Sequence, residues 1–339
     1  MKDVIVHPKP ERLSVQFWSQ ALCRENLTHL SILAALILLF GMVTDRFLTG
    51  ATFTSIAYQL PELGLLTLAM LIPLISGGLN LSITFSANIS GLVLAWVLMW
   101  GGGENASVLM LCLAIVAAIA SGAIIGWLLG VVVAYTGAHP ILASLAMMIF
   151  LRGLGEFITR GGSITGFPSE LVWLGQGELL GVPVPLVIFA LCVGLWALVL
   201  NRSRLGFTIY QIGSNLEATR YSGINTRRTL TLVYVLSGTM CAIAGIVMAS
   251  RFNSVRVGHG EAYLLITVLA CFLGRVDPFG GFGRVMPVVL SLVILQVIGS
   301  GLNLIGTNQH LATALWGGIL ILVMAVRFLW QRITLFRAQ

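Results

Sequence analysis

Few residues of this chain have the types and spacing that catalysis requires. Its only lysines are Lys2 and Lys9, so it contains no phosphate-binding loop of the Gly-x-x-x-x-Gly-Lys-Ser/Thr type. The five histidines are dispersed, and no His-Glu-x-x-His metal motif occurs. Because Glu62 and Glu156 are the only acidic residues well inside apolar runs, no Ser/His/Asp set can be placed. The sequence therefore predicts no catalytic residue, no metal site and no cofactor.

A polar segment at residues 76–82, Ser-Gly-Gly-Leu-Asn-Leu-Ser, separates two strongly apolar runs. Each glycine inside a helix costs about 1 kcal/mol, so the pair disfavours a continuous helix. Non-helical backbone at membrane depth is tolerated only inside protein or beside a water-filled cavity. We interpret the segment as a broken helix beside a solute path, or alternatively as a tight turn whose polar side chains bond neighbouring helices. The residues predicted to line the path are Gly77, Gly78, Asn80, Ser82 and Asn88.

Two charged residues, Arg152 and Glu156, lie four positions apart within one apolar run. Positions with this spacing share one face of a helix, so the two side chains can form an ion pair. Charged groups inside a membrane are costly and usually functional, but a pair can also hold helices together. We expect a structural ion pair here. Glu62, beside Pro61, is interpreted as a helix-start residue rather than as part of a path.

The longest polar segment, residues 201–228, has the pattern of a short capped helix. Ser214 or Asn215 can cap this helix at its start, and Gly223 can end it. Glu217 then falls in its first turn. Such a helix suits the docking of a partner protein, and the alternative is a loop helix lying on the membrane.

Composition places these features in a membrane protein. Hydrophobic residues make up 58 % of the 339 residues and charged residues 9 %, whereas a soluble domain carries about 25 % charged residues. A bilayer crossing needs about 20 apolar residues. We therefore predict an all-α fold, a polytopic membrane helix bundle of about ten spans, the eighth of them short. The predicted spans are 28–43, 56–76, 81–100, 107–135, 140–159, 182–200, 229–250, 262–274, 284–304 and 311–330.

The basic residues indicate how these spans are oriented. With both termini cytoplasmic, 14 of the 19 lysines and arginines fall on the cytoplasmic side and four on the other side. The net charge of +7 is thus explained by membrane orientation rather than by nucleic-acid binding. We expect one transmembrane domain at 28–330, with cytoplasmic tails at 1–27 and 331–339. Apolar residues within 13–22 favour either an amphipathic surface helix or a loosely ordered tail.

Two shorter patterns concern the arrangement of the spans. Residues 78–81 and 301–304 both read Gly-Leu-Asn-Leu, which favours inverted repeats of the kind that many transporters contain. The glycine-rich turn at 275–284 either packs against the capped helix or simply joins two spans.

Several of these patterns together resemble the permease family of bacterial ATP-binding-cassette importers for ribose, related monosaccharides and autoinducer-2. The resemblance covers roughly residues 50–325. The family motif Gly-Gly-Ile-Asp-Leu-Ser corresponds to residues 77–82, and the motif Pro-x-x-Ala-Thr/Ser-Leu-x-x-Met corresponds to residues 140–148, followed by Arg152-Gly153. The strongest match joins segment 201–228 to the next span. It comprises Gly206, Gly213, Asn215, Glu217, Ala218, Ser222-Gly223-Ile224-Asn225, Leu236-Ser237-Gly238, Ala244-Gly245 and Ala249-Ser250-Arg251.

The resemblance implies a function and a set of partners. The chain would be the transmembrane permease subunit of an importer for a sugar or similar small polar solute, in the bacterial inner membrane, working by alternating access. Its partners would be two ATP-binding subunits that hydrolyse the ATP, a second permease copy or paralogue, a periplasmic or lipid-anchored solute-binding protein, and membrane lipid, but no nucleic acid. The residues implied in coupling to the ATPase are Asn215, Glu217, Ala218, Arg220 and Gly223.

Two departures from the family pattern leave the solute open. Asn80 replaces the usual Asp, and the usual Leu-Gly-Gly-x-Ser-x-x-Gly-Gly turn reads Leu-Gly-Arg-Val-Asp-Pro-Phe-Gly-Gly at residues 273–281. Both departures are compatible with a heterodimer of two different permeases. The alternatives are an importer permease for nucleosides or branched amino acids, and a secondary transporter, which often carries ionisable residues along its ion path.

Overall fold

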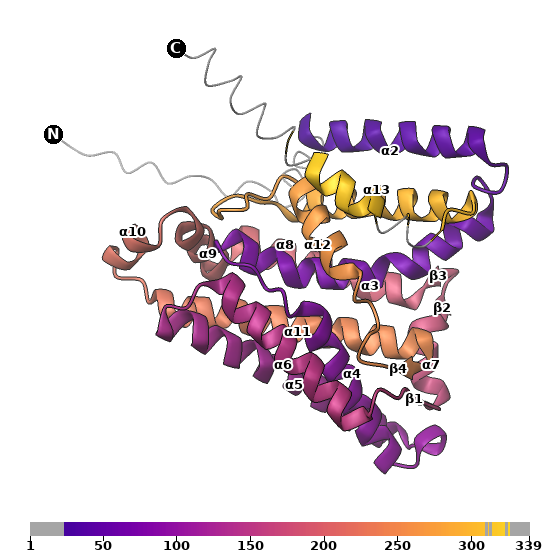
Figure 1. The fold of residues 1–339 in the computed structure, drawn as a ribbon, viewed down its shortest axis with the longest axis horizontal. Helices are drawn as coiled ribbons and strands as arrows, with labels where there is room; N and C mark the ends of the chain where they lie inside the picture. Colours follow the sequence, from indigo (N-terminus) through magenta and orange to yellow (C-terminus); the bar gives the residue numbers. More distant parts are fainter. Residues whose placement is uncertain (1–23, 309–310, 312–313, 323–324, 326–339) are drawn as a thin grey trace, which may run out of the picture.

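The structure is a computed structural model that describes residues 24–308, 311, 314–322 and 325, and it consists almost entirely of helices (Figure 1). The surface helix considered within 13–22 and the tail expected at 331–339 lie outside the described residues. The helices are α2 (Arg24–Val43), α3 (Gly50–Ile75), α4 (Ile83–Trp100), η1 (Gly103–Asn105), α5 (Val108–Thr136), α6 (Pro140–Thr159), α7 (Ser169–Gln176), α8 (Val184–Arg202), α9 (Arg204–Ser214), α10 (Leu216–Tyr221), α11 (Thr226–Phe252), α12 (Tyr263–Leu273) and α13 (Val285–Leu304). The strands are β1 (Ile164–Thr165), β2 (Glu178–Leu179), β3 (Val182–Pro183) and β4 (Ser254–Val255).

The predicted polytopic bundle is confirmed. Among the described residues, eight helices are long and apolar enough to cross a membrane: α2, α3, α4, α5, α6, α8, α11 and α13. α12 has 11 residues and matches the short eighth span. The tenth span, at 311–330, is described only in part, and its described residues are helical.

Two helices begin earlier than their apolar runs. α2 starts at Arg24 rather than near residue 28, and α3 starts at Gly50 rather than near residue 56. The first turns of α3 contain Thr54, whose hydroxyl donates to the Gly50 carbonyl at 2.9 Å. The hydroxyl is thereby satisfied within the helix, so a polar first turn can belong to a helix although a search for apolar runs does not detect it.

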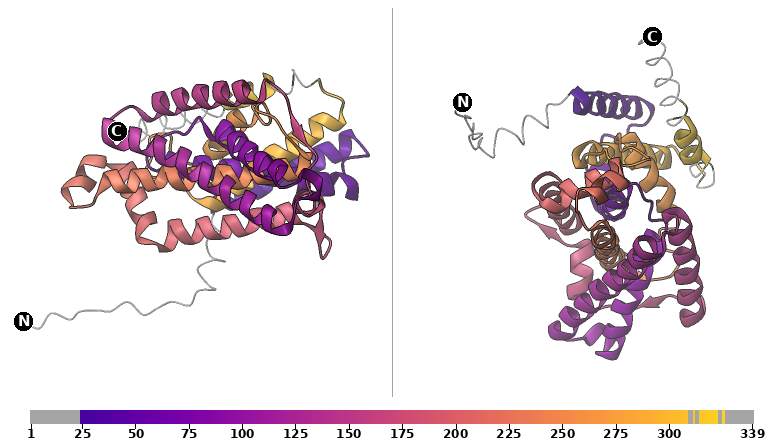
Figure 2. Two further views of the ribbon diagram at one scale, coloured as in Figure 1. Left: turned by 90° about the horizontal axis from the view of Figure 1, so that it is seen from below. Right: turned by 90° about the vertical axis from the view of Figure 1, so that its left-hand side faces the viewer.

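The centre of the bundle is formed by α3 and α11, which are buried along most of their length, whereas α6 is mostly exposed. α11 packs closely on α5 because glycines remove side chains from the contact. A Cβ on Gly126 would lie 2.2 Å from the Tyr234 carbonyl oxygen, and one on Gly238 would lie 2.1 Å from that of Gly122. Small residues allow this backbone approach between membrane helices. α2 lies at the edge of the bundle beside α13 (Figure 2).

The two ends of the bundle carry different structures (Figure 1). One end, called the α10 end below, holds α9, α10 and the turn at 275–284. The opposite end, called the strand end, holds α7 and the strands, where β1 pairs antiparallel with β4 and β2 with β3. Arginines gather at the α10 end: Arg202, Arg204, Arg220, Arg227, Arg228, Arg275 and Arg284. The two Gly-Leu-Asn-Leu segments lie at opposite ends of the bundle, 78–81 at the α10 end and 301–304 at the strand end, where α13 stops. Inverted repeats place corresponding segments on opposite sides of the membrane in this way.

Candidate functional site

The segment between α8 and α11 folds into two short helices in tandem. The Ser203 hydroxyl accepts from the Gly206 amide at 3.0 Å and starts α9, a helix that the sequence did not predict. The Asn215 side chain accepts from the Ala218 amide at 2.9 Å and starts α10. Gly223 has φ 80°, and its amide donates to the Arg220 carbonyl at 3.1 Å. The predicted cap is therefore Asn215, and the predicted glycine end of the helix is confirmed.

α10 projects from the bundle with nearly all of its side chains exposed. Only Thr219 is buried, and its hydroxyl donates to the Asn215 carbonyl at 2.8 Å. Asn215, Glu217, Ala218, Arg220 and Gly223 are all exposed. Large apolar side chains are exposed with them, since Leu216 is 43 % and Tyr221 88 % exposed, as is Phe279 in the nearby turn at 88 %. Leu216, Glu217, Arg220, Tyr221 and Phe279 are called the docking surface below, because aromatic and arginine side chains are enriched at protein interfaces.

Behind α10, three segments meet through backbone atoms at Gly77, Gly213, Gly280 and Gly281, called the glycine junction below. The Gly281 amide donates to the Ile75 carbonyl at the end of α3, at 2.8 Å. A Cβ on Gly213, in α9, would lie 2.0 Å from that same oxygen, and one on Gly280 would lie 2.6 Å from the Gly77 nitrogen. The turn at 275–284 thus packs against the end of α9 and against α3, rather than against the capped helix α10.

A tyrosine fixes this turn from its other side. The Tyr210 hydroxyl, on α9, donates to the Gly283 carbonyl at 2.6 Å. Burial raises the pKa of the Tyr210 phenol, against the opposing effect of Arg284, so the group remains a protonated donor. The junction is therefore held by two hydrogen bonds in addition to its backbone contacts.

The break at 76–82 is confirmed, since α3 ends at Ile75 and α4 begins at Ile83. Asn80 lies inside it and is buried, and both the nitrogen and the oxygen of its side-chain amide are hydrogen-bonded. Its amide donates to Ser237 Oγ at 2.9 Å, and its oxygen accepts from the amide and hydroxyl of Ser82 at 3.1 and 2.7 Å. Ser237 in turn donates to the Ala69 carbonyl at 2.7 Å. These bonds connect the break to α11 and α3. They agree with the alternative interpretation of this segment, a turn whose polar side chains bond neighbouring helices. A role of the segment in a solute path stays a prediction.

The other predicted path residues also make close protein contacts. Asn88, on α4, donates to the carbonyls of Val257 and His259 and so holds the segment after α11. Gly77 has φ 84°, and a Cβ on Gly78 would lie 2.6 Å from the Tyr234 hydroxyl. The five residues therefore do not form one cluster; Gly77, Gly78, Asn80 and Ser82 belong to the break, and Asn88 lies further along α4.

The bonding of Asn80 leads to a testable prediction for Asn80→Asp, which introduces the residue usual in the resembling family. A carboxylate cannot donate to Ser237, whose own proton is directed to Ala69. Two oxygens would then face each other in a buried site, so we expect the free energy of unfolding to fall by about 1–3 kcal/mol. Thermal unfolding of the purified protein in detergent measures this.

A matched control is Asn225→Asp. Asn225 only accepts, from the Arg228 amide at 3.0 Å, so aspartate can cap α11 equally well. Equal unfolding temperatures for Asn80→Asp and the unmodified chain would show that the bond from Asn80 to Ser237 is wrongly assigned.

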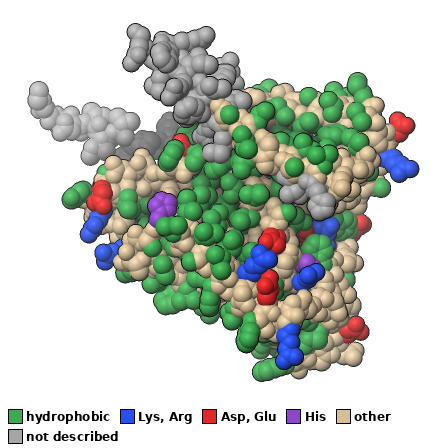
Figure 3. All heavy atoms as spheres, in the orientation of Figure 1, with side chains coloured by type: hydrophobic (Ala, Val, Ile, Leu, Met, Phe, Trp, Pro, Cys, Tyr) green, Lys and Arg blue, Asp and Glu red, His purple; other side chains and the backbone are tan. Residues whose placement is uncertain are grey.

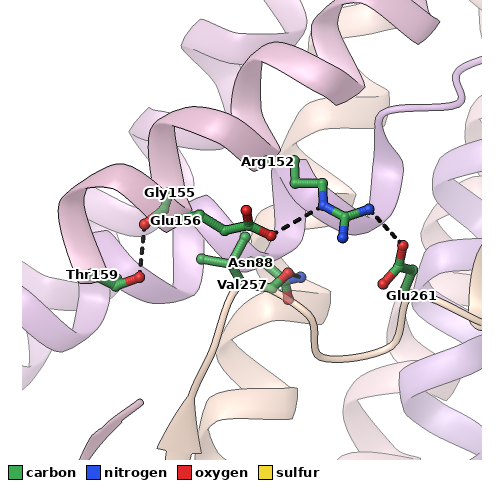
Figure 4. A network of polar contacts seen from close by, with 7 residues as sticks. All are labelled: Asn88, Arg152, Gly155, Glu156, Thr159, Val257 and Glu261. Carbon is green, nitrogen blue, oxygen red and sulfur yellow. Dashed lines mark hydrogen bonds and ion pairs between the residues drawn. The ribbon is translucent and has the colours of Figure 1, made fainter. Parts of the chain in front are cut away.

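The predicted ion pair between Arg152 and Glu156 is present and has a second carboxylate (Figure 4). Arg152 Nε lies 3.1 Å from Glu156 Oε1, and Nη1 lies 2.9 Å from Oε1 of Glu261, which precedes α12. The guanidinium lies over the Phe85 ring, 5.7 Å from its centroid. Glu261 could not be predicted as a partner from sequence spacing, because it is 109 residues away from Arg152 along the chain.

This charged cluster is not buried inside the bundle. The side chains of Arg152, Glu156 and Glu261 are 49 %, 51 % and 54 % exposed. Figure 3 shows charged side chains of both signs grouped within a largely hydrophobic face. Because exposed charges on a spanning helix are costly in lipid, this face of α6 requires water or another protein.

The prediction for Glu62 is wrong. α3 begins at Gly50, so Glu62 lies in the middle of the helix, and it is fully buried. Arg251, in the last turn of α11, lies 2.7 Å from Glu62 Oε1, and the Tyr263 hydroxyl donates to Oε2 at 3.3 Å. Pro61 also lies inside the helix. A membrane helix tolerates an internal proline because neighbouring helices can satisfy the backbone groups that it leaves unbonded. The charge is tolerated because an arginine from another helix neutralises it.

A metal site receives no support from geometry. Within the part of the chain that the structure describes, no three side chains of the His, Cys, Asp or Glu types come together as metal ligands.

These features define a multi-pass membrane protein: a bundle of spanning helices, buried hydrogen bonds and an ion pair between them, and an exposed capped helix at one end. Residues 52–324 match the family model described as the permease component of the branched-chain amino acid transport system, and the chain belongs to this family. The expected resemblance to permeases of ATP-binding-cassette importers is confirmed, and the chain is a transport subunit.

Relatives support the same assignment. The chain is 31 % identical over 308 residues to the autoinducer 2 import system permease protein LsrD of Yersinia enterocolitica, covering 88 % of this chain and 91 % of that protein. It is 30 % identical to the permeases of the same name from Yersinia pseudotuberculosis and Yersinia pestis, over 89 % of this chain and 90 % of each relative. No solved structure matches the chain.

Proposed function

We propose that this permease carries a small sugar-like solute inward across the inner membrane, driven by separate ATP-binding subunits that dock at the α10 end. One observation carries the proposal: a short, capped and almost fully exposed helix presents Leu216, Tyr221 and charged residues at the end of the bundle. Exposed aromatic groups of this size favour a protein partner over open water. Residues 28–330 would form one permease domain, with the segment 201–228 as its coupling element.

The charges at the two ends support the orientation. At the α10 end the described arginines outnumber the described acidic residues, which are Glu25 at the start of α2, Glu217 and Asp277. The strand end is rich in carboxylates, including Asp45, Glu104 and Glu170. Since basic residues concentrate on the cytoplasmic side of membrane proteins, the α10 end would be cytoplasmic, together with both termini. A solute-binding protein would then reach the strand end.

The exposed cluster of Arg152, Glu156 and Glu261 supports a second permease subunit. α6 contacts α4 and α5 on one side and leaves its charged face uncovered. A second copy or a paralogue facing it would enclose these charges with water between two bundles, away from lipid. The break at 76–82 and Asn88 on α4 would then border that path and move as it opens alternately to each side.

The relatives favour a sugar-like solute. The permeases from three Yersinia species are named for autoinducer-2, whereas the family description names branched-chain amino acids. The two departures noted above, at Asn80 and in the turn 273–281, are features that a paralogous permease partner can complement.

The test is mild-detergent purification of the tagged chain from its native membrane, followed by mass spectrometry. An ATP-binding subunit should co-purify, and a second permease would indicate a heterodimer. A chain that purifies alone and still moves solute in proteoliposomes without ATP would instead be a secondary transporter.

The docking surface gives a sharper form of this test. We expect the double variant Tyr221→Ala/Phe279→Ala to retain less than about a tenth of the co-purified ATPase, because buried aromatic anchors dominate interface energies. Trp100→Ala is the matched control, since Trp100 is equally exposed, at 92 %, at the opposite end. Retention of the ATPase by the double variant would place the docking site elsewhere.

A further inference from the structure

A cavity of about 210 Å³ lies between α3, α12, α13 and the helical residues near Trp316. It is smaller than the roughly 300–1,000 Å³ typical of pockets for drug-sized ligands, so it suits a small solute. It lies in the half of the bundle nearer the strand end, where α3 and α12 begin and α13 ends. The side chains that matter below are Gln59, Gln296, Asn303, Thr307, Tyr263 and Trp316.

Among the residues that the structure describes, the polar groups lining the cavity are all uncharged. Gln296, on α13, donates its amide to Gln59 Oε1 on α3 at 2.9 Å, and Gln59 donates in turn to Ser55 at 2.9 Å. The carbonyl oxygen of Gln296 is left to accept another bond. Asn303 and Thr307 add an amide and a hydroxyl where α13 ends. Polar side chains in spanning helices face the interior of the bundle or a water-filled cavity rather than lipid, so these groups indicate an interior site.

Two aromatic rings complete the lining. The hydroxyl of Tyr263 is held by Glu62 at 3.3 Å, and Glu62 is held by Arg251 at 2.7 Å, so the ring has a fixed orientation. Trp316 packs over Gly299, where an added Cβ would lie 3.4 Å from Cζ2 of the indole. Gly299 therefore leaves room for the indole beside α13.

Amides, a hydroxyl and flat rings together match the chemistry of a polyhydroxylated molecule. Its hydroxyls can donate to and accept from amide groups, and its C–H faces can pack on aromatic rings. A zwitterionic amino acid would bring two charges into a cavity whose described lining residues offer no charged partner, and an unpaired buried charge is strongly unfavourable. Glu62, which accepts from the lining residue Tyr263, is already paired with Arg251. Glu261, next to the lining residue Ala262, is paired with Arg152.

We propose that this cavity binds a small, uncharged, polyhydroxylated solute on its way through the permease; the inference rests on the import function proposed above. Trp316 and Tyr263 pack against the solute, and Gln296 and Asn303 bond its hydroxyls. The cavity thereby selects against amino acids, independently of any solute-binding protein.

The test uses the purified permease, with its partner chains, in lipid nanodiscs. Tryptophan fluorescence is followed while D-ribose, autoinducer-2, xylitol or L-leucine is added. At least one of the three polyhydroxylated probes should change the emission, and L-leucine should not. Trp316→Phe should abolish that change, whereas Trp100→Phe, at an exposed site outside the cavity, should keep it.

A second variant does not depend on the indole. Asn303→Leu should weaken the response about tenfold through the loss of one polar contact, and Asn105→Leu, at an exposed site outside the cavity, should not. Asn303 is exposed, so its replacement does not disturb the core. Binding of L-leucine in place of the three probes, an unchanged response in both cavity variants, or no response to any probe would each overturn the proposal.

ATP-driven uptake in proteoliposomes separates this inference from the import function. Uptake by the unmodified complex that is equally fast in Asn303→Leu and Trp316→Phe overturns the cavity site and leaves the import function standing. Absence of ATP-driven uptake in the unmodified complex overturns the import function, while the fluorescence titration still decides whether the cavity binds polyols.

Discussion

ATP-driven uptake should be lost in Glu217→Lys, while the protein still folds and inserts. Glu217 is exposed in the first turn of α10, so its replacement removes no core contact. A lysine at the start of a helix costs only about 0.3–1 kcal/mol against the helix dipole. On the docking surface, by contrast, the reversed charge would face groups selected to contact a carboxylate, and such a mismatch costs several kcal/mol. ATPase binding should weaken about 100-fold or more.

Glu170→Lys provides the matched control. Glu170 is also exposed in the first turn of a short helix, α7, but at the strand end. It suffers the same helix-dipole penalty, so it reports the effect of the substitution on folding alone. The ATPase should co-purify with Glu170→Lys and not with Glu217→Lys. Normal uptake by Glu217→Lys in membrane vesicles would show that Glu217 takes no part in docking the ATP-binding subunit.

Replacing Arg251 by methionine should destabilise the protein by roughly 3–5 kcal/mol. Arg251 is the ion-pair partner of Glu62, which is fully buried in the middle of α3. Without the arginine, Glu62 is left as an unpaired buried charge, or it must take up a proton. Thermal unfolding in detergent should show a large fall in midpoint temperature.

Two further variants separate the pair from a general loss of positive charge. Arg256→Met removes an exposed arginine from the segment after α11 and should leave the midpoint nearly unchanged. The double variant Glu62→Gln/Arg251→Met removes both charges and should recover most of the lost stability, because neither partner is left unpaired. A double variant as unstable as Arg251→Met would mean that Arg251 stabilises α11 by some other contact.

Local features of this structure could be predicted from sequence because neighbouring residues determine them. The cap at Asn215, the helix end at Gly223 and the break at residues 76–82 each depend on a few consecutive residues. Span positions depended on apolar runs in the same way, and the errors fell at polar first turns, such as the start of α3 at Gly50.

The contacts that the sequence did not predict join residues far apart in the chain. Arg251 pairs with Glu62, and Glu261 pairs with Arg152, from distant segments of the chain, and no local spacing indicates such a pair. The cavity depends on the convergence of α3, α12 and α13, which is a property of packing. Asn80 was located correctly, but its hydrogen-bond partner Ser237 became known only from the fold.

At the glycine junction, Gly213 and Gly281 bring the backbones of α9, α3 and the turn 275–284 into direct contact, with no side chain between them. Side chains can absorb a small displacement by changing rotamer, but backbone atoms in van der Waals contact cannot. A displacement of α9 is therefore transmitted to the end of α3 with little loss, because no flexible side chain lies between the two backbones. Fractions of an ångström at the surface of the bundle would then suffice to move its buried centre.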